Sequence, residues 1–287
     1  MSNFPGRVAV VTGAGSGIGR ALALDLARRG AKLALSDVNA AGVAETAAQA
    51  EKAGSPEVIH GTLDVSDRAA FLAYGDEVVA HFGKVNQLYN NAGIAFTRTI
   101  LESEFEDYER VFNVNLWGVI NGTKAFLPHL IASGEGHVTN ISSLNGLMAQ
   151  PEMSHYVATK FAVRGFTETL RMEMITSKAP VKVSVVHPGG IATSIASNAS
   201  KAELDRKGGG TAEEQAYAAT REKVYNKKLL KLPAEKAAEI ITNGVAKNKP
   251  RIVVGNDAKA LDVFIRIAPK AYQPIIGSYF AKMFKDR

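Results

Sequence analysis

Tyr156 and Lys160 stand four residues apart in the chain. Four residues are about one helical turn, so on a helix the phenol and the ammonium project from the same face. A cation beside a phenol favours the phenolate and predicts a tyrosine pKa below the usual value of about 10, suited to acid/base work near neutral pH. Ser142 and Ser143 lie fourteen and thirteen residues upstream, and a serine hydroxyl could hold the substrate oxygen. Because many exposed helices carry such a tyrosine–lysine pair by chance, the surrounding elements must show whether this pair is catalytic.

The first forty residues predict a phosphate-binding turn. An apolar run over 7–12 indicates a buried strand, the glycine-rich turn 13–19 follows, and a helical pattern continues to Gly30. Glycines let the backbone approach a pyrophosphate, and the N-terminus of a helix offers free N–H groups with a partial positive charge. A second strand over 32–36 leads to Asp37, about 20 residues past the glycines, where a carboxylate can bind ribose hydroxyls. The order of elements therefore predicts a dinucleotide site.

The glycine motif and the candidate catalytic residues together resemble those of the short-chain dehydrogenase/reductase family. The resemblance covers about residues 5–195 and is specific, because independent motifs follow one another in the family's order; the part after about 195 matches only loosely. The matching residues are Thr12-Gly13-x-x-x-Gly17-x-Gly19, Asp64-Val65, Asn90-Asn91-Ala92-Gly93, Asn115 in Asn113-Val114-Asn115, Ser143, Tyr156, Lys160, Pro188-Gly189 and Thr193.

The resemblance implies a role for each matching residue. Tyr156 would be the general acid/base that takes the hydroxyl proton of an alcohol while a hydride leaves the same carbon for a nicotinamide ring. Lys160 would lower the tyrosine pKa and hold the nicotinamide ribose, and Ser143 would be the catalytic serine, with Ser142 packed or bonded locally. Asn115 would hold a water that links the lysine to solvent; alternatively its amide is satisfied by the backbone inside a helix. The expected cofactor-binding residues are Gly13, Ser16, Gly17, Ile18, Gly19, Asp37, Asp64, Val65, Asn91, Ala92, Gly93, Tyr156, Lys160, Pro188, Gly189, Ile191 and Thr193.

Asp37 favours NAD as the cofactor. A carboxylate there can bind both hydroxyls of the adenosine ribose and repels the 2′-phosphate of the phosphorylated cofactor. Family members that use the phosphorylated form often carry Arg or Lys beside the glycines or just after this position, where this chain has Ser16 and Val38. Arg20 is expected on the surface of the first helix.

Strands and helices alternate along the chain, which predicts a single α/β domain over 1–287: a doubly wound, Rossmann-type parallel sheet with helices on both faces. The family resemblance implies the strand order 3-2-1-4-5-6-7. Candidate site residues follow predicted strands, so they should meet at the carboxyl edge of the sheet, where ligands bind. Beyond 37 we expect helices near 40–53, 67–82, 104–131, 154–176 and 234–247, and strands near 57–63, 85–90, 137–142, 182–187 and 251–254.

The segment 193–232 contains no predicted strand and follows directly after the site, so we expect a substrate lid. The residues expected near the substrate are mostly apolar, which favours a hydrophobic, bulky secondary alcohol or its ketone. Two alternatives stay open: another reaction on the same residues, such as epimerisation or acyl-thioester reduction, and a non-catalytic dinucleotide sensor. The expected substrate residues are Phe96, Ser143, Leu144, Asn145, Met153, Gly190 and Ile191.

Composition excludes several other classes. Cysteine is absent from the 287 residues, so disulfides, thiolate catalysis and cysteine metal sites are excluded. The histidines show no metal-binding spacing, so no metal is expected, and His155 is expected at an exposed helix start. The net charge is +6, with +9 in residues 221–287, but no nucleic-acid-binding motif accompanies it. Without an apolar signal segment or a continuous apolar stretch of about 18 residues, a cytoplasmic protein is expected.

The basic C-terminal region, 258–287, carries two amphipathic stripes at helical spacing, flanked by lysines. We expect these stripes to pack on the subunit or across a homo-oligomer interface, as a dimer or tetramer. Docking on a membrane surface, through an apolar face ringed with lysine, is the less favoured alternative.

Overall fold

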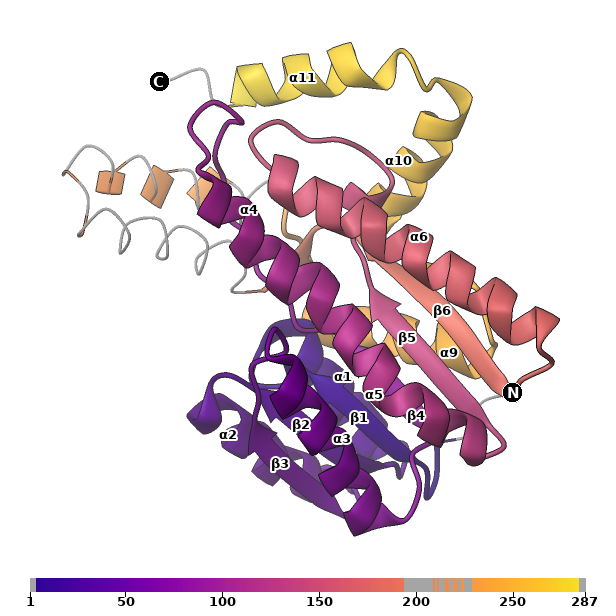
Figure 1. Cartoon of the computed structure of the whole chain (residues 1–287). Helices are drawn as coiled ribbons and strands as arrows, with labels where there is room; N and C mark the ends of the chain where they lie inside the picture. The colour runs from indigo at the N-terminus through magenta and orange to yellow at the C-terminus, as the bar shows by residue number, and fades with distance from the viewer. Residues whose placement is uncertain are drawn as a thin grey trace.

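The computed structural model describes residues 4–193, 209, 211, 215–216, 219–220, 223–224 and 229–283. They form one α/β domain around a seven-stranded parallel sheet (Figure 1). The strand order, β3-β2-β1-β4-β5-β6-β9, confirms the predicted arrangement. The strands are β1 (Val8–Thr12), β2 (Lys32–Asp37), β3 (Val58–Thr62), β4 (Gln87–Asn90), β5 (Gly136–Ile141), β6 (Val181–Pro188) and β9 (Arg251–Val254).

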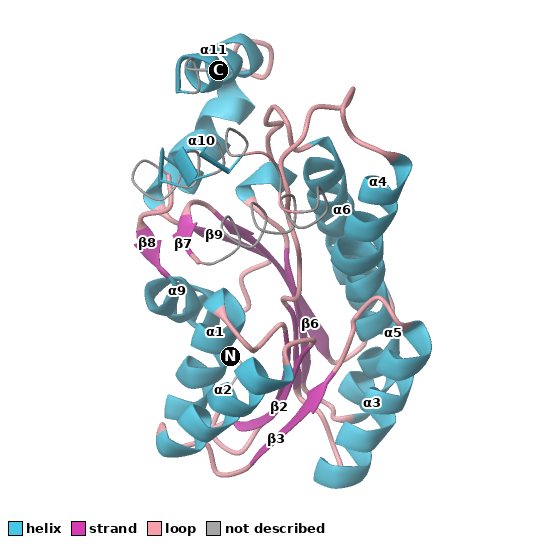
Figure 2. Ribbon diagram, turned by 90° about the vertical axis from the view of Figure 1, so that its left-hand side faces the viewer, coloured by secondary structure: helices cyan, strands magenta, loops and turns pink. Residues whose placement is uncertain are grey.

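Helices cover both faces of this sheet (Figure 2). Their bounds agree closely with the predicted ones. Among the described residues, no helix combines the length and the apolar character that a membrane crossing requires. One face carries α1 (Gly17–Arg28), α2 (Ala40–Lys52) and α9 (Ala234–Ala246), and the other carries α3 (Arg68–Phe82), α4 (Phe105–Phe112), α5 (Gly118–Ala132) and α6 (Ser154–Thr176).

Successive residues of β1 contribute to two separate apolar cores. Val8 and Val10 pack with α3, α5 and α6, whereas Ala9 and Val11 pack with α1, α2 and α9. Side chains alternate between the faces of a strand, so a strand covered on both faces is apolar throughout. This explains why the predicted strand 7–12 is largely apolar. Because both faces of β1 are buried, its end is fixed in place under the glycine-rich turn.

The long helix predicted over 104–131 contains a π-helical segment. This segment, η1 (Asn113–Trp117), joins α4 to α5 without a break. Single π-helical turns inside α-helices are frequent at functional sites, because the extra residue in the turn re-aims side chains. Here the π-helical turn contains the fully buried Asn115.

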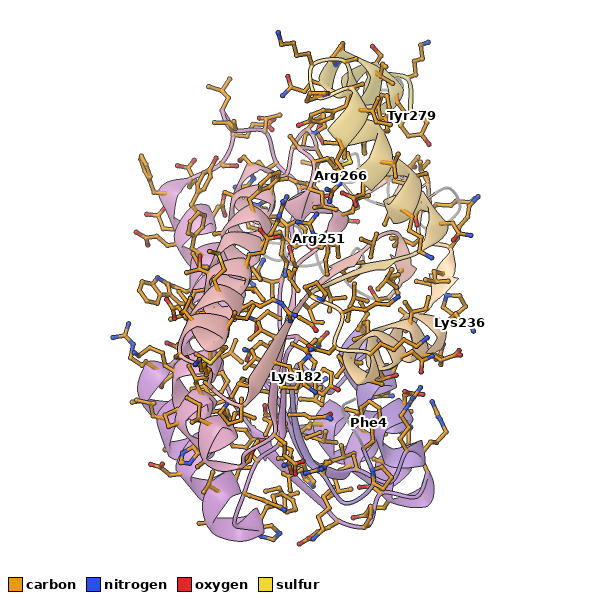
Figure 3. The ribbon with its side chains drawn as sticks, turned by 90° about the vertical axis from the view of Figure 1, so that its right-hand side faces the viewer. Phe4, Lys182, Lys236, Arg251, Arg266 and Tyr279 are labelled. Carbon is orange, nitrogen blue, oxygen red and sulfur yellow. The ribbon has the colours of Figure 1, made fainter. Side chains whose placement is uncertain are left out.

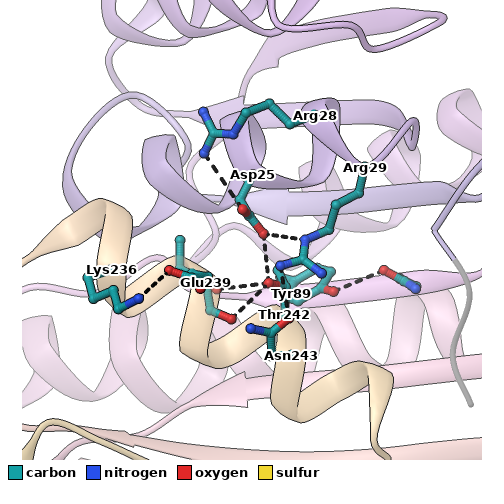
Figure 4. A network of polar contacts seen from close by, with 10 residues as sticks. Asp25, Arg28, Arg29, Tyr89, Lys236, Glu239, Thr242 and Asn243 are labelled. Carbon is teal, nitrogen blue, oxygen red and sulfur yellow. Dashed lines mark hydrogen bonds and ion pairs between the residues drawn. The ribbon is translucent and has the colours of Figure 1, made fainter.

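Asp25 ties α1 to α9 through buried polar contacts (Figure 4). Its Oδ2 accepts hydrogen bonds from Thr242 Oγ1 at 2.6 Å and from Arg29 Nε at 2.7 Å. Arg29 also donates to Asn243 Oδ1 at 3.0 Å. A buried carboxylate is stable when several donors replace its water, so these contacts hold the two helices in one relative position. Since α1 begins at the glycine-rich turn, they also fix that turn.

A second, two-stranded parallel sheet lies beside the carboxyl edge of the main sheet. It pairs β7 (Ile191–Ala192) with β8 (Leu232–Pro233), which the sequence did not predict as strands. The predicted lid, 193–232, joins these strands, and most of it lies outside the described residues.

The last two helices of the described chain, α10 (Asn256–Ile267) and α11 (Tyr272–Met283), are called the C-terminal arm below. The arm lies beyond the carboxyl edge of the sheet and carries Arg266 and Tyr279 (Figure 3). The amphipathic runs predicted there are helical. Their apolar side chains are not fully covered by the subunit: Ile267 is 78% exposed and Tyr279 is 48% exposed.

Candidate active site

A cavity of about 850 Å³ opens at the carboxyl edge of the sheet. Its size is within the range of small-molecule and cofactor sites, about 300–1,000 Å³. The strands β1, β2, β4, β5 and β6 all end at this cavity, so residues far apart in the sequence share its wall. All the predicted cofactor-binding residues except Gly19 line it, namely Gly13, Ser16, Gly17, Ile18, Asp37, Asp64, Val65, Asn91, Ala92, Gly93, Tyr156, Lys160, Pro188, Gly189, Ile191 and Thr193.

The glycine-rich turn is too tightly packed for side chains at two positions. Gly13 has φ +64°, and a Cβ there would lie 2.8 Å from Ala92 Cα. A Cβ at Gly19, which does not line the cavity, would overlap the Gly13 carbonyl oxygen. Thr12 holds the facing segment, because its Oγ1 accepts from the N–H groups of Asn91 and Ala92 at 3.0 and 3.1 Å. The turn and the segment after β4 thus form one rigid wall.

The N-terminus of α1 is suited to an anion. Ser16 is its N-cap residue but makes no capping hydrogen bond, and the first turn of the helix contains no acidic residue. The first N–H groups of a helix lack partners within the helix and carry a partial positive charge. Together with the backbone approach that Gly13 and Gly17 allow, this cradle fits a dinucleotide pyrophosphate.

Asp37 lies at the end of β2 beside this cradle. Its Oδ2 accepts from the Gly15 N–H at 2.8 Å, which aims the carboxylate at the turn. The neighbouring Val38 also lines the cavity and is 66% exposed. Arg20 is half-buried rather than a simple surface residue, because its guanidinium donates to the Gly15 carbonyl and pairs with Glu45 at 2.8 Å. The arginine is therefore engaged, and Asp37 sets the charge at this end of the cavity.

Tyr156 and Lys160 lie in the first two turns of α6, at the other end of the cavity. Lys160 Nζ is 5.4 Å from the centroid of the Tyr156 ring and donates to the Ile141 carbonyl at 3.0 Å. Burial lowers the pKa of Lys160 to about 8. Burial also raises the pKa of Tyr156, against a smaller lowering by its hydrogen bond with the Ser143 side chain. The expectation of a tyrosine pKa below its usual value is therefore wrong for the protein without cofactor: the net shift is upward, because desolvation of the phenolate dominates.

The two serines after β5 have different surroundings. Both line the cavity, but Ser142 is buried and donates to the Lys160 carbonyl at 2.7 Å. Ser143 precedes the short 3₁₀ helix η2 (Leu144–Gly146) and bonds with the Tyr156 side chain. The buried imidazole of His187 holds the Ser143 carbonyl through Nδ1 at 2.8 Å, and burial lowers the histidine pKa to about 4. His187 is thus a neutral donor that fixes the Ser143 backbone.

The Asn115 side chain is occupied by hydrogen bonds to protein groups. Its Oδ1 accepts from the Ile94 N–H at 2.8 Å, and its Nδ2 donates to the Ile94 carbonyl at 2.9 Å and to Thr159 Oγ1 at 3.3 Å. These contacts hold the segment after β4 against α6. They match the alternative in which the amide is satisfied by backbone, and the water-holding role implied by the family resemblance stays a prediction.

Of the expected substrate residues, three line the cavity: Phe96, Ser143 and Ile191. Leu144, Asn145, Met153 and Gly190 do not belong to its wall: the Asn145 amide instead donates to Gln150 Oε1 at 3.2 Å. Sequence reasoning did not assign several other lining residues. They lie within the matched motifs or next to them in the sequence, and this proximity could have identified them. These are Leu63, Ser66, Ile94, Ala95, Asn113 and Val114.

His155 is fully buried, so the expectation of an exposed helix start is wrong. Its ring lies 3.8 Å from the Phe96 ring centroid and 5.8 Å from that of Tyr108. Burial lowers its pKa to about 4. The segment with Phe96 covers this histidine because Arg98 pairs with Asp107 at 2.5 Å, and both of these side chains are largely buried. Among the described residues, no group of three or more His, Asp or Glu side chains is placed to hold a metal ion.

We expect Lys160→Met to stabilise the protein at pH 7 while it removes activity. Below the folded pKa of about 8 the ammonium is charged in both states, so the full burial cost is present. Between about pH 8 and 10.5 the unfolded chain binds more protons, so wild-type stability rises with pH and the advantage of the variant fades. We expect the free energy of unfolding to rise by about 2 kcal/mol at pH 7. Relieving a pKa shift of this size contributes about 3 kcal/mol, and leaving the Ile141 carbonyl without its donor costs about 1 kcal/mol.

Urea unfolding of wild-type and variant protein from pH 7 to 10.5, without added cofactor, measures this effect. The matched control is Lys52→Met at an exposed position of α2, where no ammonium is removed from a buried site. A Lys160→Met variant that is less stable than wild type at pH 7 contradicts the prediction.

Comparisons with known proteins agree with this geometry. The model of the short chain dehydrogenase family matches residues 7–204. SadH of Mycobacterium tuberculosis, whose name describes an oxidoreductase and gives no substrate, is 53% identical over 284 residues, 99% of each chain. Mouse epidermal retinol dehydrogenase 2 is 41% identical over 65% of this chain and 60% of its own. A short-chain dehydrogenase/reductase from Burkholderia phymatum, crystallised with NAD, superimposes with a TM-score of 0.84 at 32% identity, over 94% of this chain and 96% of its own.

The family model and the long match to SadH both include the glycine-rich turn and the Ser143, Tyr156 and Lys160 positions. The sheet order and the cavity at its carboxyl edge lead to the same assignment. The chain belongs to the short-chain dehydrogenase/reductase family.

Proposed function

We propose that the protein is an NAD-dependent oxidoreductase that interconverts a hydrophobic, bulky secondary alcohol and its ketone. The observation that carries this proposal is the shared cavity: Tyr156, Lys160 and Ser143 line the same space as the glycine-rich turn and Asp37. An acid/base group and a nicotinamide cofactor must meet at one carbon for this reaction, and a single cavity with both sets of residues supports that arrangement.

The chemistry follows from Tyr156, Lys160 and Ser143, which line the cavity. NAD, when bound, accepts the hydride from the alcohol carbon. The Tyr156 phenolate takes the hydroxyl proton, and the Ser143 hydroxyl donates to the same substrate oxygen. Because burial raises the tyrosine pKa, the phenolate form must be favoured by positive charge nearby, and the Lys160 ammonium supplies it when its own proton is retained. Reduction runs through the same groups in reverse, with Tyr156 as the proton donor.

The cofactor assignment rests on the adenosine end of the cavity. Asp37 fits the two hydroxyls of an adenosine ribose and opposes a 2′-phosphate. Among the residues beside it, Arg20 already pairs with Glu45 and Val38 is apolar, so neither supplies a cation for a phosphate. The Burkholderia phymatum neighbour crystallised with NAD is consistent with this assignment.

The substrate class is argued from the apolar part of the cavity lining. This part comprises Ile94, Ala95, Phe96, Ile191 and Leu230. Apolar walls bind apolar ligands mainly through the surface removed from water. The likeness to a retinol dehydrogenase, at 41% identity over 65% of this chain, supports a lipophilic alcohol.

A cofactor-reduction screen tests the proposed function. Purified protein is incubated with NAD and a panel of secondary alcohols of increasing size, and the absorbance of reduced cofactor is followed. We expect turnover with hydrophobic alcohols and little with small polar ones. Turnover found only in a parallel assay, in which acyl-thioesters are incubated with the reduced cofactor and its absorbance falls, would point to another reaction on the same residues. NAD binding without turnover of any substrate would favour the sensor alternative.

We further propose a cytoplasmic homo-oligomer with the C-terminal arm at a subunit interface. Its support is the set of exposed apolar side chains on the arm, which a second copy could cover: Val263 and Ile267 on α10, and Ile275 and Tyr279 on α11. Removing 270–287 is expected to change the oligomeric state, measured by light scattering. Flotation tests the alternative of membrane docking: the full-length protein should not float with vesicles that contain anionic lipid. Unchanged oligomerisation, or salt-sensitive flotation lost on truncation, would contradict this proposal.

A further inference from the structure

The Gly190 peptide, which joins β6 to β7, is held on both sides by the C-terminal part of the chain. Its N–H donates to Asp257 Oδ2 at 2.8 Å, in the first turn of α10. Its carbonyl accepts from the N–H groups of Lys231 and Leu232, both at 3.1 Å. The preceding peptide is also fixed, because the Gly189 N–H donates to the Val254 carbonyl at 2.9 Å.

These contacts hold the cavity wall from behind. Pro188, Gly189, Ile191 and Thr193 line the cavity, whereas Gly190 in their midst does not. Packing behind the wall is close: a Cβ at Gly189 would lie 2.5 Å from Asp257 Oδ2, and one at Gly190 would overlap the Leu229 carbonyl oxygen. Glycines at both positions thus let Asp257 reach the backbone of the wall, and the wall cannot shift outward without breaking the Asp257 bond.

The bond from Asp257 differs in kind from the backbone bonds around it. An ionised carboxylate that accepts from an N–H makes a stronger hydrogen bond than a neutral carbonyl does. Its position in the first turn of α10 also places the carboxylate beside the partial positive charge of the helix N-terminus. Asp262, in the next turn of the same helix, instead pairs with Arg266 at 2.8 Å. Asp257 is the acidic group of this helix that accepts a hydrogen bond from the Gly190 N–H.

We propose that Asp257 is a positioning residue for the cofactor. It fixes the Gly190 peptide so that the 188–193 segment presents a preformed wall to the nicotinamide half of NAD, and the C-terminal arm thereby becomes part of the active site. Asp257 does not line the cavity and acts through the backbone. The inference rests on the proposed function only in taking NAD as the ligand.

The test compares wild type with Asp257→Ala, Asp257→Asn and the matched control Asp262→Asn. NAD binding is measured by titration calorimetry, and steady-state kinetics with the best alcohol give KM and kcat. A charge-assisted bond on a preformed wall predicts that Asp257→Ala raises the Kd and the KM for NAD about fivefold, with kcat within about twofold. Asp257→Asn, which retains an acceptor without the charge, should raise both less, and the control should leave them unchanged.

Amide hydrogen exchange of the peptide that contains Gly190 and Ile191, measured without NAD, provides a second readout. Faster exchange in Asp257→Ala than in Asp262→Asn supports the proposal, because the Gly190 N–H has lost its acceptor. Unchanged exchange together with unchanged Kd overturns it, as does an equal change in the control, which would indicate a general effect of α10. If wild type itself fails to bind NAD, the proposed function fails, and the exchange result still decides whether Asp257 holds the wall.

Discussion

Tyr156→Phe is expected to lower kcat for alcohol oxidation by about 10²–10⁴-fold, the range that a positioned acid/base group contributes, with the Kd for NAD nearly unchanged. The variant removes the hydroxyl alone, so the ring beside Lys160 and the packing of α6 are retained. In wild type, burial raises the tyrosine pKa. The rate of oxidation should therefore rise with pH, as the phenolate becomes populated, and this rise should be absent from the residual activity of the variant.

Tyr108→Phe is the matched control for this substitution. The Tyr108 hydroxyl bonds with Ser154 Oγ at 2.8 Å, on the same helix as Tyr156, but Tyr108 does not line the cavity. Its loss should change kcat by less than about threefold, as expected for a hydroxyl that makes no transition-state contact. A Tyr156→Phe variant that retained more than about a tenth of wild-type kcat would show that another group is the acid/base.

The second large effect is expected at the cofactor end of the cavity, where Asp37→Ser combined with Val38→Arg should narrow or reverse the preference for NAD. The double variant removes the carboxylate that opposes a 2′-phosphate and adds a cation at an exposed lining position. We expect the ratio of kcat/KM for NAD to that for the phosphorylated cofactor to fall by about 10²-fold, since losing a repulsion and gaining a charge-assisted bond are each worth about tenfold.

Two comparisons make this result specific. Val38→Arg alone should shift the ratio less than the double variant, because Asp37 remains to neutralise the new cation. Asp67→Ser, at the N-cap of α3 and outside the cavity wall, should leave the ratio unchanged. Equal kcat/KM for the two cofactors in the unmodified protein would contradict the assignment of Asp37.

The sequence by itself predicted the strands of the sheet and, through its matched motifs, many of the residues that line the cavity at the carboxyl edge. The first strand contains the continuous apolar run 8–11, the strand predicted at 182–187 is rich in valine and is followed by a proline, and α6 was placed correctly at 154–176. These signals are local, since a few adjacent residues determine whether a segment is buried and how it repeats. Because parallel strands end at one edge, motifs such as Gly13, Asp37 and Pro188 could be brought together without coordinates.

Only the tertiary structure decided which neighbours cover each residue. His155 is buried because the Arg98–Asp107 pair holds the Phe96 segment over it, a contact between parts of the chain about sixty residues apart. The tyrosine pKa is raised because burial of the Tyr156 side chain outweighs its hydrogen bond with Ser143. Likewise, Asp257 meets Gly190 across 67 residues. Periodicity and spacing report what a residue's own helix or strand requires, whereas desolvation and long-range contacts arise only when separate elements pack together.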